Sequence, residues 1–479
     1  MDTRDFDGIP HEPAARLTRR TALGLSGAGL ATAAFGVAGA RAAIAQTASP
    51  VAATPAASPG ASPAASPAAR VGLATVPKVF SYDAFEFEFL GMLGSTYERG
   101  ADIGECYATA SKIQDYDFDG WVAAWRATAD RVHGIAEQSA SQKHDISARE
   151  AYLRAATYYG AAAFFAAGTK DPSQQESIWE AHRASADAFF SLLTPAAEPV
   201  TIPYEGTTLP GYALTVDSSG EPRPWLIMNN GSDGTVTDMW VQGAAEGLRR
   251  GYNVLIFDGP GQGAALFRQK LYFRPDWEKV ITPVVDWLLT RPDVDAKRIA
   301  IMGISQGGYW VPRALAFEQR IAAAIADPGV FNVATAFTSN VPPDALDALN
   351  TAQGAALAQI KKEFDEEVDK GLQESPVVRY TLDSRMAPYG TTSFADLLLM
   401  VQAYTLKDVI GQIRCPMLVA NPEGETFWPG QAKQVYEALT GPKKLADFTA
   451  AEGADLHCEV KANGLRAQVF FDWLDETLA

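Results

Sequence analysis

The segment from Arg298 to Trp310, with the sequence RIAIMGISQGGYW, places the strongest constraint on how this chain can fold. It begins with a short apolar strand, Ile299 to Met302, and a helix is expected to begin near Gly308. The G-x-S-x-G spacing around Ser305 is typical of a nucleophile elbow, a strained turn that lifts a serine hydroxyl clear of a sheet. Glycines are needed there because neighbouring backbone comes too close for a β-carbon. The segment therefore predicts Ser305 as a nucleophile beside the positive end of a helix.

Length, charge and cysteine content limit the classes of protein to which the chain can belong. With 479 residues, 47% of them hydrophobic, it is long enough for two folded units with appendages. The formal charge of −17 argues against a nucleic-acid partner, because phosphate binding needs a basic surface. Cys106, Cys415 and Cys458 are too few and too scattered for a disulfide framework or a zinc site. The sequence therefore predicts no metal site.

The N-terminus has the features of an export signal. The pair Arg19-Arg20 precedes a mildly apolar run, Ala22 to Ala40, and Ala43-Ile44-Ala45 has the small-x-small pattern of a cleavage site. Residues 1–45 are therefore predicted to be a twin-arginine signal peptide, and the product to be periplasmic, cell-wall-associated or extracellular, without stable membrane insertion after cleavage. An uncleaved anchor is disfavoured because Gly and Ser interrupt a run that a spanning helix would fill with about 20 strongly apolar residues.

The pattern of the sequence changes three times after the signal. Residues 46–78 repeat Ala-Ser-Pro and are expected to form an extended linker. Residues 79–195 show helical periodicity without a convincing strand, which predicts a helical domain that walls one side of a pocket. Over residues 196–479 strands alternate with helices, an order that gives a mostly parallel sheet with helices on both faces. Residues 331–413 interrupt this order with helical stretches and are predicted to be an inserted cap.

Acyl-transfer chemistry at Ser305 needs backbone N–H groups that hold the developing oxyanion. The N–H of Gln306, the residue after the serine, is the first expected donor. The second should come from the loop after the third strand, where Ser232 is the candidate within the sequence Asn-Gly-Ser-Asp-Gly. Composition alone is equally typical of a plain turn. The position directly after the third strand favours the oxyanion role.

A serine hydroxyl is a poor nucleophile until a base takes its proton. In this topology the chain order is serine, acid, histidine. His457 alone among the five histidines lies downstream of Ser305, on a loop between the last expected strand and the last helix. It is therefore the predicted base.

The acid that orients the histidine should lie in the loop after the strand Pro416 to Ala420. Glu425 has the expected position in that loop if Pro429 marks its turn into the following helix. Other carboxylates remain as alternatives: Glu423, Asp327 and Asp455.

Several segments together resemble one group of α/β-hydrolases, which includes the fermentation-respiration switch protein, 2,6-dihydroxypseudooxynicotine hydrolase and the fungal polyketide-shortening hydrolases. They are AREAYLRAATYY in the helical block, FDGPGQG (residues 257–263), the elbow GISQGG and the ending EGADLHC (residues 452–458). The resemblance runs from Phe80 nearly to the C-terminus. It implies an α/β-hydrolase fold with the active site between the helical domain and the hydrolase core, a Ser-acid-His triad, no cofactor and often a homodimer. This chain has glutamate at position 425, where many relatives have aspartate.

These features predict a serine hydrolase in which His457 deprotonates Ser305 and Glu425 orients the imidazole. The expected substrate is a small organic ester or a β-diketone-like compound whose carbon–carbon bond is cut. An acyltransferase with the same triad and a non-catalytic binding or regulatory protein on the same fold are the alternatives. Aromatic residues close to the triad in sequence are expected to line the pocket: Tyr309, Trp310 and Trp428.

Overall fold

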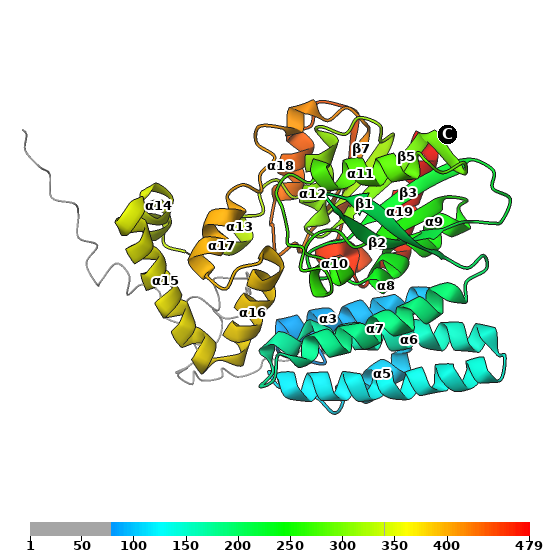
Figure 1. The fold of residues 1–479 in the computed structure, drawn as a ribbon, viewed down its shortest axis with the longest axis horizontal. Coiled ribbons are helices and arrows are strands. Elements are labelled where there is room, and N and C mark those ends of the chain that lie inside the picture. The colour runs from blue at the N-terminus through cyan, green and yellow to red at the C-terminus, as the bar shows by residue number, and fades with distance from the viewer. Residues whose placement is uncertain (1–77, 340) are drawn as a thin grey trace, which may run out of the picture.

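The computed structural model describes residues 78–339 and 341–479, so the predicted signal peptide and all of the predicted linker but Lys78 lie outside the described residues. The first described segments are helical: α3 (Asp83–Ser95), α4 (Ile103–Ala110), α5 (Phe118–Ser141), α6 (Asp145–Phe164) and α7 (Gln174–Ser191). Figure 1 shows α3 and α5 to α7, coloured blue to green, as a layer beneath the sheet. Aromatic side chains such as Trp121, Trp125 and Phe165 fill the core between them.

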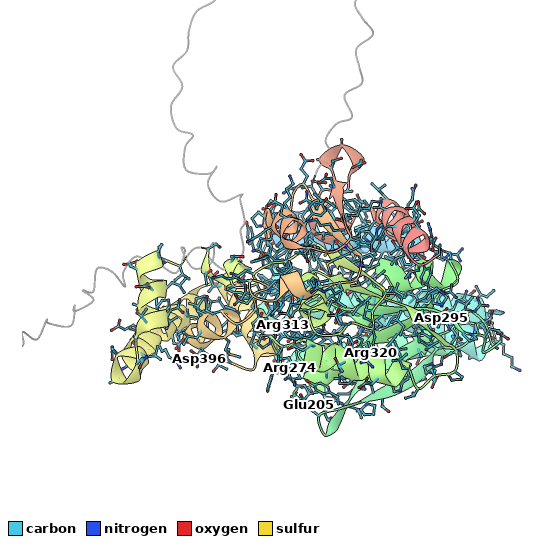
Figure 2. The ribbon with its side chains drawn as sticks, turned by 90° about the horizontal axis from the view of Figure 1, so that it is seen from above. Glu205, Arg274, Asp295, Arg313, Arg320 and Asp396 are labelled. Atoms are coloured by element: carbon cyan, nitrogen blue, oxygen red, sulfur yellow. The ribbon has the colours of Figure 1, made fainter. Side chains whose placement is uncertain are left out.

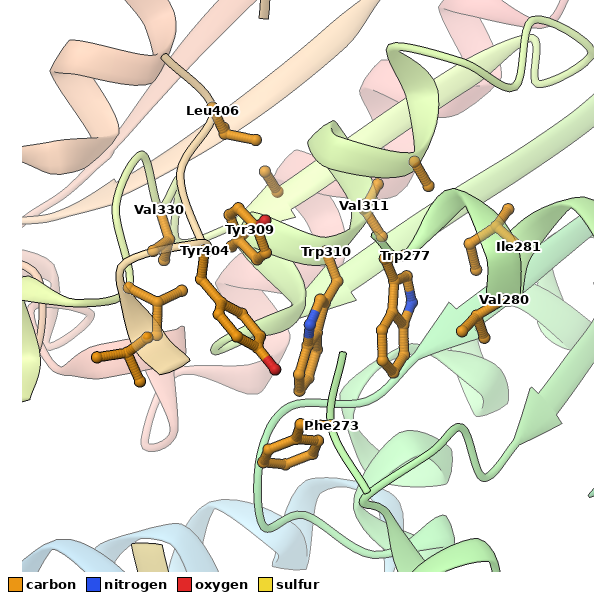
Figure 3. Packing of buried hydrophobic residues seen from close by; sticks show 14 of the residues in the cluster. Phe273, Trp277, Val280, Ile281, Tyr309, Trp310, Val311, Val330, Tyr404 and Leu406 are labelled. Carbon is orange, nitrogen blue, oxygen red and sulfur yellow. The ribbon is translucent and has the colours of Figure 1, made fainter. Parts of the chain in front are cut away.

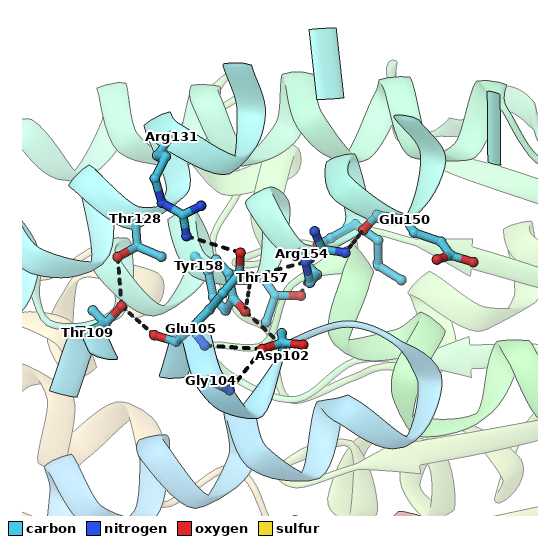
Figure 4. A network of polar contacts seen from close by, with 11 residues as sticks. Asp102, Gly104, Glu105, Thr109, Thr128, Arg131, Glu150, Arg154, Thr157 and Tyr158 are labelled. Atoms are coloured by element: carbon cyan, nitrogen blue, oxygen red, sulfur yellow. Dashed lines mark hydrogen bonds and ion pairs between the residues drawn. The ribbon is translucent and has the colours of Figure 1, made fainter. Parts of the chain in front are cut away.

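A polar network joins three of these helices (Figure 4). The Glu105 carboxylate on α4 accepts hydrogen bonds from Arg131 on α5 at 3.1 Å and from Arg154 on α6 at 3.1 Å. Tyr158 on α6 donates to the same carboxylate at 2.9 Å and accepts from the backbone N–H of Asp102 at 2.9 Å. The short helix α4 is thereby fixed to the longer pair α5 and α6.

The chain then forms one eight-stranded sheet in the order β1-β2-β4-β3-β5-β6-β7-β8. Its strands are β1 (Glu198–Tyr204), β2 (Thr207–Leu214), β3 (Arg223–Asn229), β4 (Asn253–Phe257), β5 (Val294–Ile304), β6 (Ala323–Asp327), β7 (Met417–Pro422) and β8 (Lys443–Phe448). Strand β2 is antiparallel to both of its neighbours, whereas β3 to β8 run parallel. The predicted mostly parallel α/β sheet is confirmed.

Helices cover both faces of this sheet because side chains alternate along its buried strands. On β3, Trp225 and Ile227 belong to one core, whereas Leu226 and Met228 belong to the other. The covering helices are α8 (Val236–Met239), α9 (Ala245–Arg249), α10 (Gly263–Phe267), α11 (Glu278–Leu288), α12 (Gly307–Leu315), α18 (Gln431–Ala438) and α19 (Asn463–Thr477). Ion pairs lie on the surface, and one of them joins Arg274 to Glu205 (Figure 2).

The helical segment between β3 and β4 is divided in the structure. A π-helical turn, η3 (Trp240–Ala244), separates α8 from α9. Within this turn Gly243 packs directly on the sheet, since a β-carbon there would lie 2.8 Å from the Met228 Cε atom. The close approach of helix and strand accompanies the local change in helical pitch.

The segment predicted as a cap is helical and leaves the sheet between β6 and β7. It contains α13 (Thr335–Thr338), α14 (Pro343–Thr351), α15 (Gly354–Glu374), α16 (Pro376–Met386), η4 (Ala387–Tyr389), α17 (Phe394–Val401) and η5 (Ile410–Gln412). In Figure 1 helices α14 and α15, coloured yellow, project away from the sheet and α16 returns towards the helical layer. There Tyr380 packs on Phe165 with ring centroids 4.7 Å apart. None of the helices described over residues 78–339 and 341–479 has the length and hydropathy needed to cross a bilayer.

A buried ion pair connects the helical layer to the sheet. Arg183 on α7 donates to Asp258, directly after β4, at 2.8 Å, and the two side chains are only 7% and 2% exposed. Asp258 also accepts a hydrogen bond from the backbone N–H of Ala264 at 3.0 Å. The Arg183 guanidinium lies over the ring of Tyr212, 4.8 Å from its centroid. The two parts of the chain are thus joined by a pair of charges that water does not reach.

Candidate active site

The turn between β5 and α12 has the geometry of the predicted elbow. Ser305 adopts a left-handed backbone conformation with φ of 57°, which a residue with a side chain rarely takes. A β-carbon on Gly303 would lie 2.2 Å from the carbonyl oxygen of Gly307, and one on Gly308 would lie 1.8 Å from that of Pro328. The glycines of this segment are therefore required by space, and the strained turn presents Ser305 at the edge of the sheet.

The loop after β8 brings His457 to this serine. His457 opens the turn η7 (His457–Glu459), and its Nε2 atom lies 2.9 Å from the Ser305 Oγ atom. Cys458 and Glu459 have φ angles of 53° and 45°, so the backbone is also strained directly after the histidine. In the arrangement that supports catalysis, the Ser305 hydroxyl donates its hydrogen bond to Nε2.

The loop after β7 brings Glu425 to the other side of the imidazole. The Oε2 atom of Glu425 lies 2.6 Å from Nδ1 of His457. Its Oε1 atom accepts hydrogen bonds from the backbone N–H groups of Phe427 at 2.7 Å and Trp428 at 3.0 Å. Both carboxylate oxygens are therefore held by donors, which fixes the direction of the carboxylate towards the imidazole.

The alternative carboxylates have other contacts. Glu423 accepts a hydrogen bond from the backbone N–H of Ala450 at 2.9 Å, and Asp455 pairs with Lys461 at 2.9 Å. Asp327 is the last residue of β6, and its backbone oxygen accepts a hydrogen bond from the Ser305 N–H at 2.6 Å. Of the four candidates, Glu425 is the one that the structure places in hydrogen-bond contact with the imidazole.

Electrostatics favour a charged carboxylate beside a basic imidazole. Burial acts to raise the pKa of Glu425, but the bond to His457 and the two backbone N–H donors hold this pKa below its ordinary value. Burial acts to lower the pKa of His457, but the charge of Glu425 raises it above its ordinary value. An ionised Glu425 that accepts from Nδ1–H leaves the lone pair of Nε2 directed at Ser305.

A second pair of carboxyl groups, Asp327 and Glu459, lies near this row, and of the two only Asp327 was considered from the sequence, as an alternative acid. Asp327 and Glu459 are both completely buried, and no donor among the described residues reaches any of their four oxygen atoms. Burial raises the pKa of Asp327 to about 6, and burial together with Asp327 raises that of Glu459 well above its ordinary range. A charge on Asp327 therefore disfavours ionisation of Glu459.

The loop after β3 runs directly past the nucleophile. A β-carbon on Gly231 would lie 2.7 Å from the Ser305 Cβ atom, so the loop and the elbow are in contact. The Gln262 side-chain amide donates to the carbonyl oxygens of Asn230 at 2.9 Å and Gly231 at 2.8 Å, which fixes this loop. Gln262 belongs to the FDGPGQG segment, and only the resemblance had drawn attention to it.

The two N–H groups expected to hold an oxyanion lie at this junction. Gln306 precedes the first turn of α12, and Ser232 follows Gly231 in the loop beside Ser305. Among the described residues, neither backbone N–H donates to a protein acceptor, whereas that of Gly231 donates to the side chain of Asn230 at 2.7 Å. Both groups are therefore available to a ligand beside Ser305.

Comparison with known proteins decides the family of this fold and site. The model of the family described as esterase FrsA-like matches residues 107–368. The chain belongs to the FrsA-like esterase family. Its relatives include hydrolase LUC6 of Fusarium sp, which is 32% identical over 84% of this chain and 98% of that protein. The 20-hydroxy-prefusarin hydrolase FUS2 of Gibberella moniliformis is 32% identical over 84% of this chain and 98% of that protein.

The solved structures agree on the fold. The crystal structure of 2,6-dihydroxy-pseudo-oxynicotine hydrolase matches this FrsA-like chain with a TM-score of 0.61 and 21% identity, over 81% of this chain and 95% of that one. AbyA5 matches with a TM-score of 0.53 and 16% identity, over 83% of this chain and 99% of that one. With the hydrolases and esterases among its relatives, the chain is an α/β-hydrolase enzyme.

Ser305 lies on the wall of a cavity of about 550 Å³ in this member of the FrsA-like family. The loop after β3, the helical layer and the insertion enclose it together, and His457, Gln306 and Ser232 also line it. Most of its lining is apolar, with aromatic residues from all parts of the chain: Phe87, Phe164, Phe267, Phe337, Tyr389, Phe427 and Trp428. Such a cavity suits a small organic molecule.

Aromatic rings surround the His457 imidazole on the cavity side. Ring centroids of Phe427, Trp428 and Phe87 lie 4.6, 5.9 and 6.4 Å from that of His457. Trp428 therefore has the lining position that the sequence predicted. Phe87, on α3, was not predicted, because its contact with the imidazole depends on the packing of the helical layer.

Tyr309 and Trp310 do not line the cavity, and the prediction that they do is wrong. Both are completely buried in the hydrophobic core, beside Trp277 and Tyr404 (Figure 3). Trp310 stacks on Trp277 with ring centroids 4.3 Å apart, and the Tyr309 hydroxyl donates to the Pro275 carbonyl oxygen at 2.9 Å. Proximity to Ser305 in sequence was misleading, because the first turn of α12 directs Trp310 onto Trp277 and Tyr309 towards Tyr404.

The insertion contacts both expected oxyanion residues. From α16, Arg385 donates to the Asp233 carboxylate at 2.7 Å and to the Ser232 hydroxyl at 3.3 Å. From η4, the Tyr389 hydroxyl lies 3.2 Å from the side-chain amide nitrogen of Gln306. The insertion therefore helps to position the loop and the helix end that face Ser305. Over the described parts of the chain, no three acidic, histidine or cysteine side chains are grouped in a way that could hold a metal ion.

Proposed function

We propose that this enzyme is a serine hydrolase that uses Ser305, His457 and Glu425 to cleave an ester or a β-diketone-like carbon–carbon bond in a small organic substrate. The observation that carries the proposal is the hydrogen-bonded row on the cavity wall. It runs from Glu425 to His457 at 2.6 Å and from His457 to Ser305 at 2.9 Å. This is the arrangement that nucleophilic catalysis by a serine requires.

In the proposed reaction, Ser305 Oγ attacks the substrate carbonyl while its proton moves to Nε2 of His457. Glu425 stabilises the imidazolium that forms. The N–H groups of Gln306 and Ser232 hold the oxyanion. His457 then gives its proton to the leaving group, which is an alcohol from an ester or an enolate carbon from a β-diketone. Water, deprotonated by His457, finally releases the acyl group from the serine.

The cavity supports a substrate with a large apolar part. Its volume of about 550 Å³ is within the range of small-molecule sites, and its aromatic lining offers contact area to rings or unsaturated chains. The relative FUS2 and the structural neighbour 2,6-dihydroxy-pseudo-oxynicotine hydrolase are both named after hydroxylated organic compounds. Small oxygenated organic molecules are therefore the first substrates to assay.

The test uses Ser305→Ala with Ser384→Ala as the matched control, because Ser384 also lines the cavity but has no part in the proposed mechanism. Hydrolysis of p-nitrophenyl esters should fall roughly 10³-fold or more in Ser305→Ala, and labelling by a fluorophosphonate probe should disappear. Ser384→Ala should keep both. Parental ester hydrolysis in Ser305→Ala would refute the mechanism. A parallel assay with an aryl β-diketone separates carbon–carbon cleavage from ester cleavage.

We also propose export by the twin-arginine route, on the basis of Arg19-Arg20 and the small-x-small pattern ending at Ala45. The test expresses the full chain with both arginines changed to lysine. The parental chain should be processed and found outside the cytoplasm, whereas the variant should stay unprocessed inside. Equal export of both chains would contradict this proposal.

A further inference from the structure

One acidic side chain in the cavity has no part in the mechanism above. Glu88 lies on α3 and lines the cavity, and the ring of its neighbour Phe87 is 6.4 Å from that of His457. Burial and nearby carboxylates raise the pKa of the Glu88 carboxyl. No hydrogen bond or ion pair to this carboxyl occurs among the described residues. It is a strong polar group that faces the space where a substrate binds.

The other acids that line the cavity are engaged by the protein itself. Glu86 accepts hydrogen bonds from the backbone N–H groups of Val79 and Phe80, both at 3.0 Å. The remaining contacts are those of Asp83 with Lys78 at 2.6 Å, of Asp233 with Arg385 at 2.7 Å and of Asp238 with the Thr235 N–H at 2.7 Å. Glu88 therefore differs from its neighbours, because its hydrogen-bonding capacity is left for a ligand.

The surroundings of Glu88 disfavour a negative charge. Burial, with the charges of Asp238 and Asp233, raises the pKa of Glu88 to about 8. The groups that face it from neighbouring elements are these two carboxylates, the Tyr380 hydroxyl, His457 and Arg385. The guanidinium of Arg385 binds the Asp233 carboxylate. At neutral pH Glu88 is therefore largely a neutral carboxylic acid, whose O–H is a hydrogen-bond donor.

We propose that Glu88 is a specificity-determining residue that donates a hydrogen bond from its carboxylic acid to a second, uncharged oxygen of the substrate. This inference rests on the proposed function and narrows its substrate class. The substrate then carries a ketone, hydroxyl or similar oxygen at a distance from the bond that is cut, and its remaining surface packs on the aromatic lining. A hydrocarbon chain at this place would bury the acid O–H without an acceptor, so binding of an oxygenated molecule is favoured over a plain hydrocarbon chain.

The test compares the parental enzyme with Glu88→Gln and Glu88→Leu on two kinds of p-nitrophenyl ester. One kind has a plain alkyl acyl chain. The other is a series of esters in which a ketone occupies successive carbons of the same chain. The parental enzyme should prefer one oxo ester over the alkyl ester in kcat/KM. Glu88→Leu should reduce this preference roughly tenfold, as loss of one buried hydrogen bond predicts. Glu88→Gln should retain it, because the amide N–H replaces the acid O–H.

The dependence on pH gives a readout that a purely structural role would not move. As pH rises through about 8, Glu88 loses its proton, and the preference of the parental enzyme for the oxo ester should fall. The preference of Glu88→Gln should stay constant over the same range. An equal preference for the oxo ester in Glu88→Leu and in the parental enzyme would overturn the inference. A preference of the parental enzyme for an aminoalkyl ester would also overturn it, because that cation needs the ionised carboxylate.

A measurement without turnover separates this inference from the proposed function. Infrared difference spectra between the parental enzyme and Glu88→Gln should contain the C=O band of a protonated carboxyl at neutral pH, which shifts when an alkyl diketone is added. If the parental enzyme cleaves none of the esters, the proposed function fails, whereas this band and its shift still support the role of Glu88. A carboxylate band at neutral pH, or no shift with any ketone of the series, would refute it.

Discussion

Replacement of Glu425 by glutamine tests the catalytic row with a change of only one atom. The Oε1 atom of Glu425 accepts two backbone N–H groups, from Phe427 and Trp428. In Glu425→Gln the amide oxygen must keep this position, because an amide nitrogen would face two donors. The amide N–H then points at Nδ1 of His457, which the Glu425 Oε2 atom approaches to 2.6 Å in the parental enzyme.

This geometry sets the expected magnitude. Two donors cannot face each other at that distance, so the imidazole must move its proton to Nε2, the atom that should receive the proton of Ser305. The base is lost while the shape of the site is kept. We expect kcat to fall roughly 10⁴-fold, as for the same change in other triads. That corresponds to about 5 kcal/mol of transition-state stabilisation. Thermal unfolding should change little, because volume and backbone hydrogen bonds are preserved.

The assay is hydrolysis of a p-nitrophenyl ester, with the rate of fluorophosphonate labelling as a second measure. Glu423→Gln is the matched control, since Glu423 lies in the same loop and contacts the Ala450 N–H and not the imidazole. It should keep its activity within a few-fold of the parental enzyme. Activity of Glu425→Gln within tenfold of the parental value would refute the assignment of the acid and the argument from its hydrogen bonds.

Further predictions concern stability and pH. Gly308→Ala should lower the unfolding free energy by about 3 kcal/mol or more, seen as a lower melting temperature, because its β-carbon would lie 1.8 Å from the Pro328 carbonyl oxygen; an unchanged melting temperature would contradict the elbow geometry. Arg183→Met should lower the free energy of chemical unfolding by about 3–5 kcal/mol, because it leaves Asp258 buried and unpaired. The double variant with Asp258→Leu should recover most of that loss. Equal stability of the parental chain and both variants would show that the pair contributes nothing. Because Glu425 raises the pKa of His457 above 6.5, kcat/KM should fall as pH decreases through a value above 6.5, and an acid limb below 6.5 would be inconsistent with this pairing.

Much of the sheet could be predicted because its strands are short apolar runs bounded by turn residues. Strand β4, for example, coincides with the apolar run NVLIF, Asn253–Phe257. By contrast, β5 begins at Val294, five residues before the predicted start at Ile299. The extra residues include Asp295, Lys297 and Arg298, which carry no apolar pattern. Arg223, on the neighbouring strand β3, pairs with Val294 and thereby extends β5 at its start. This extension depends on tertiary contact.

The candidate triad could be predicted because chain order constrains it strongly. With one histidine after Ser305 and one loop after the matching strand, few combinations of residues remained. The cavity could not be predicted in the same way, since its walls come from segments far apart in the sequence. Tyr309 was placed in it by proximity to Ser305, although the direction of a helical side chain decides such contacts. Glu88 was missed because nothing in the pattern of α3 shows that this face meets the hydrolase core.

The ion pair between Arg183 and Asp258 limits how proteins of this kind can be recombined. One charge is supplied by the helical layer and the other by the sheet, and both are out of reach of water. A chimaera that combines this sheet with a helical layer lacking an arginine at the place of Arg183 would bury Asp258 without its base. An engineer who wishes to graft a new helical layer should therefore begin with these two positions.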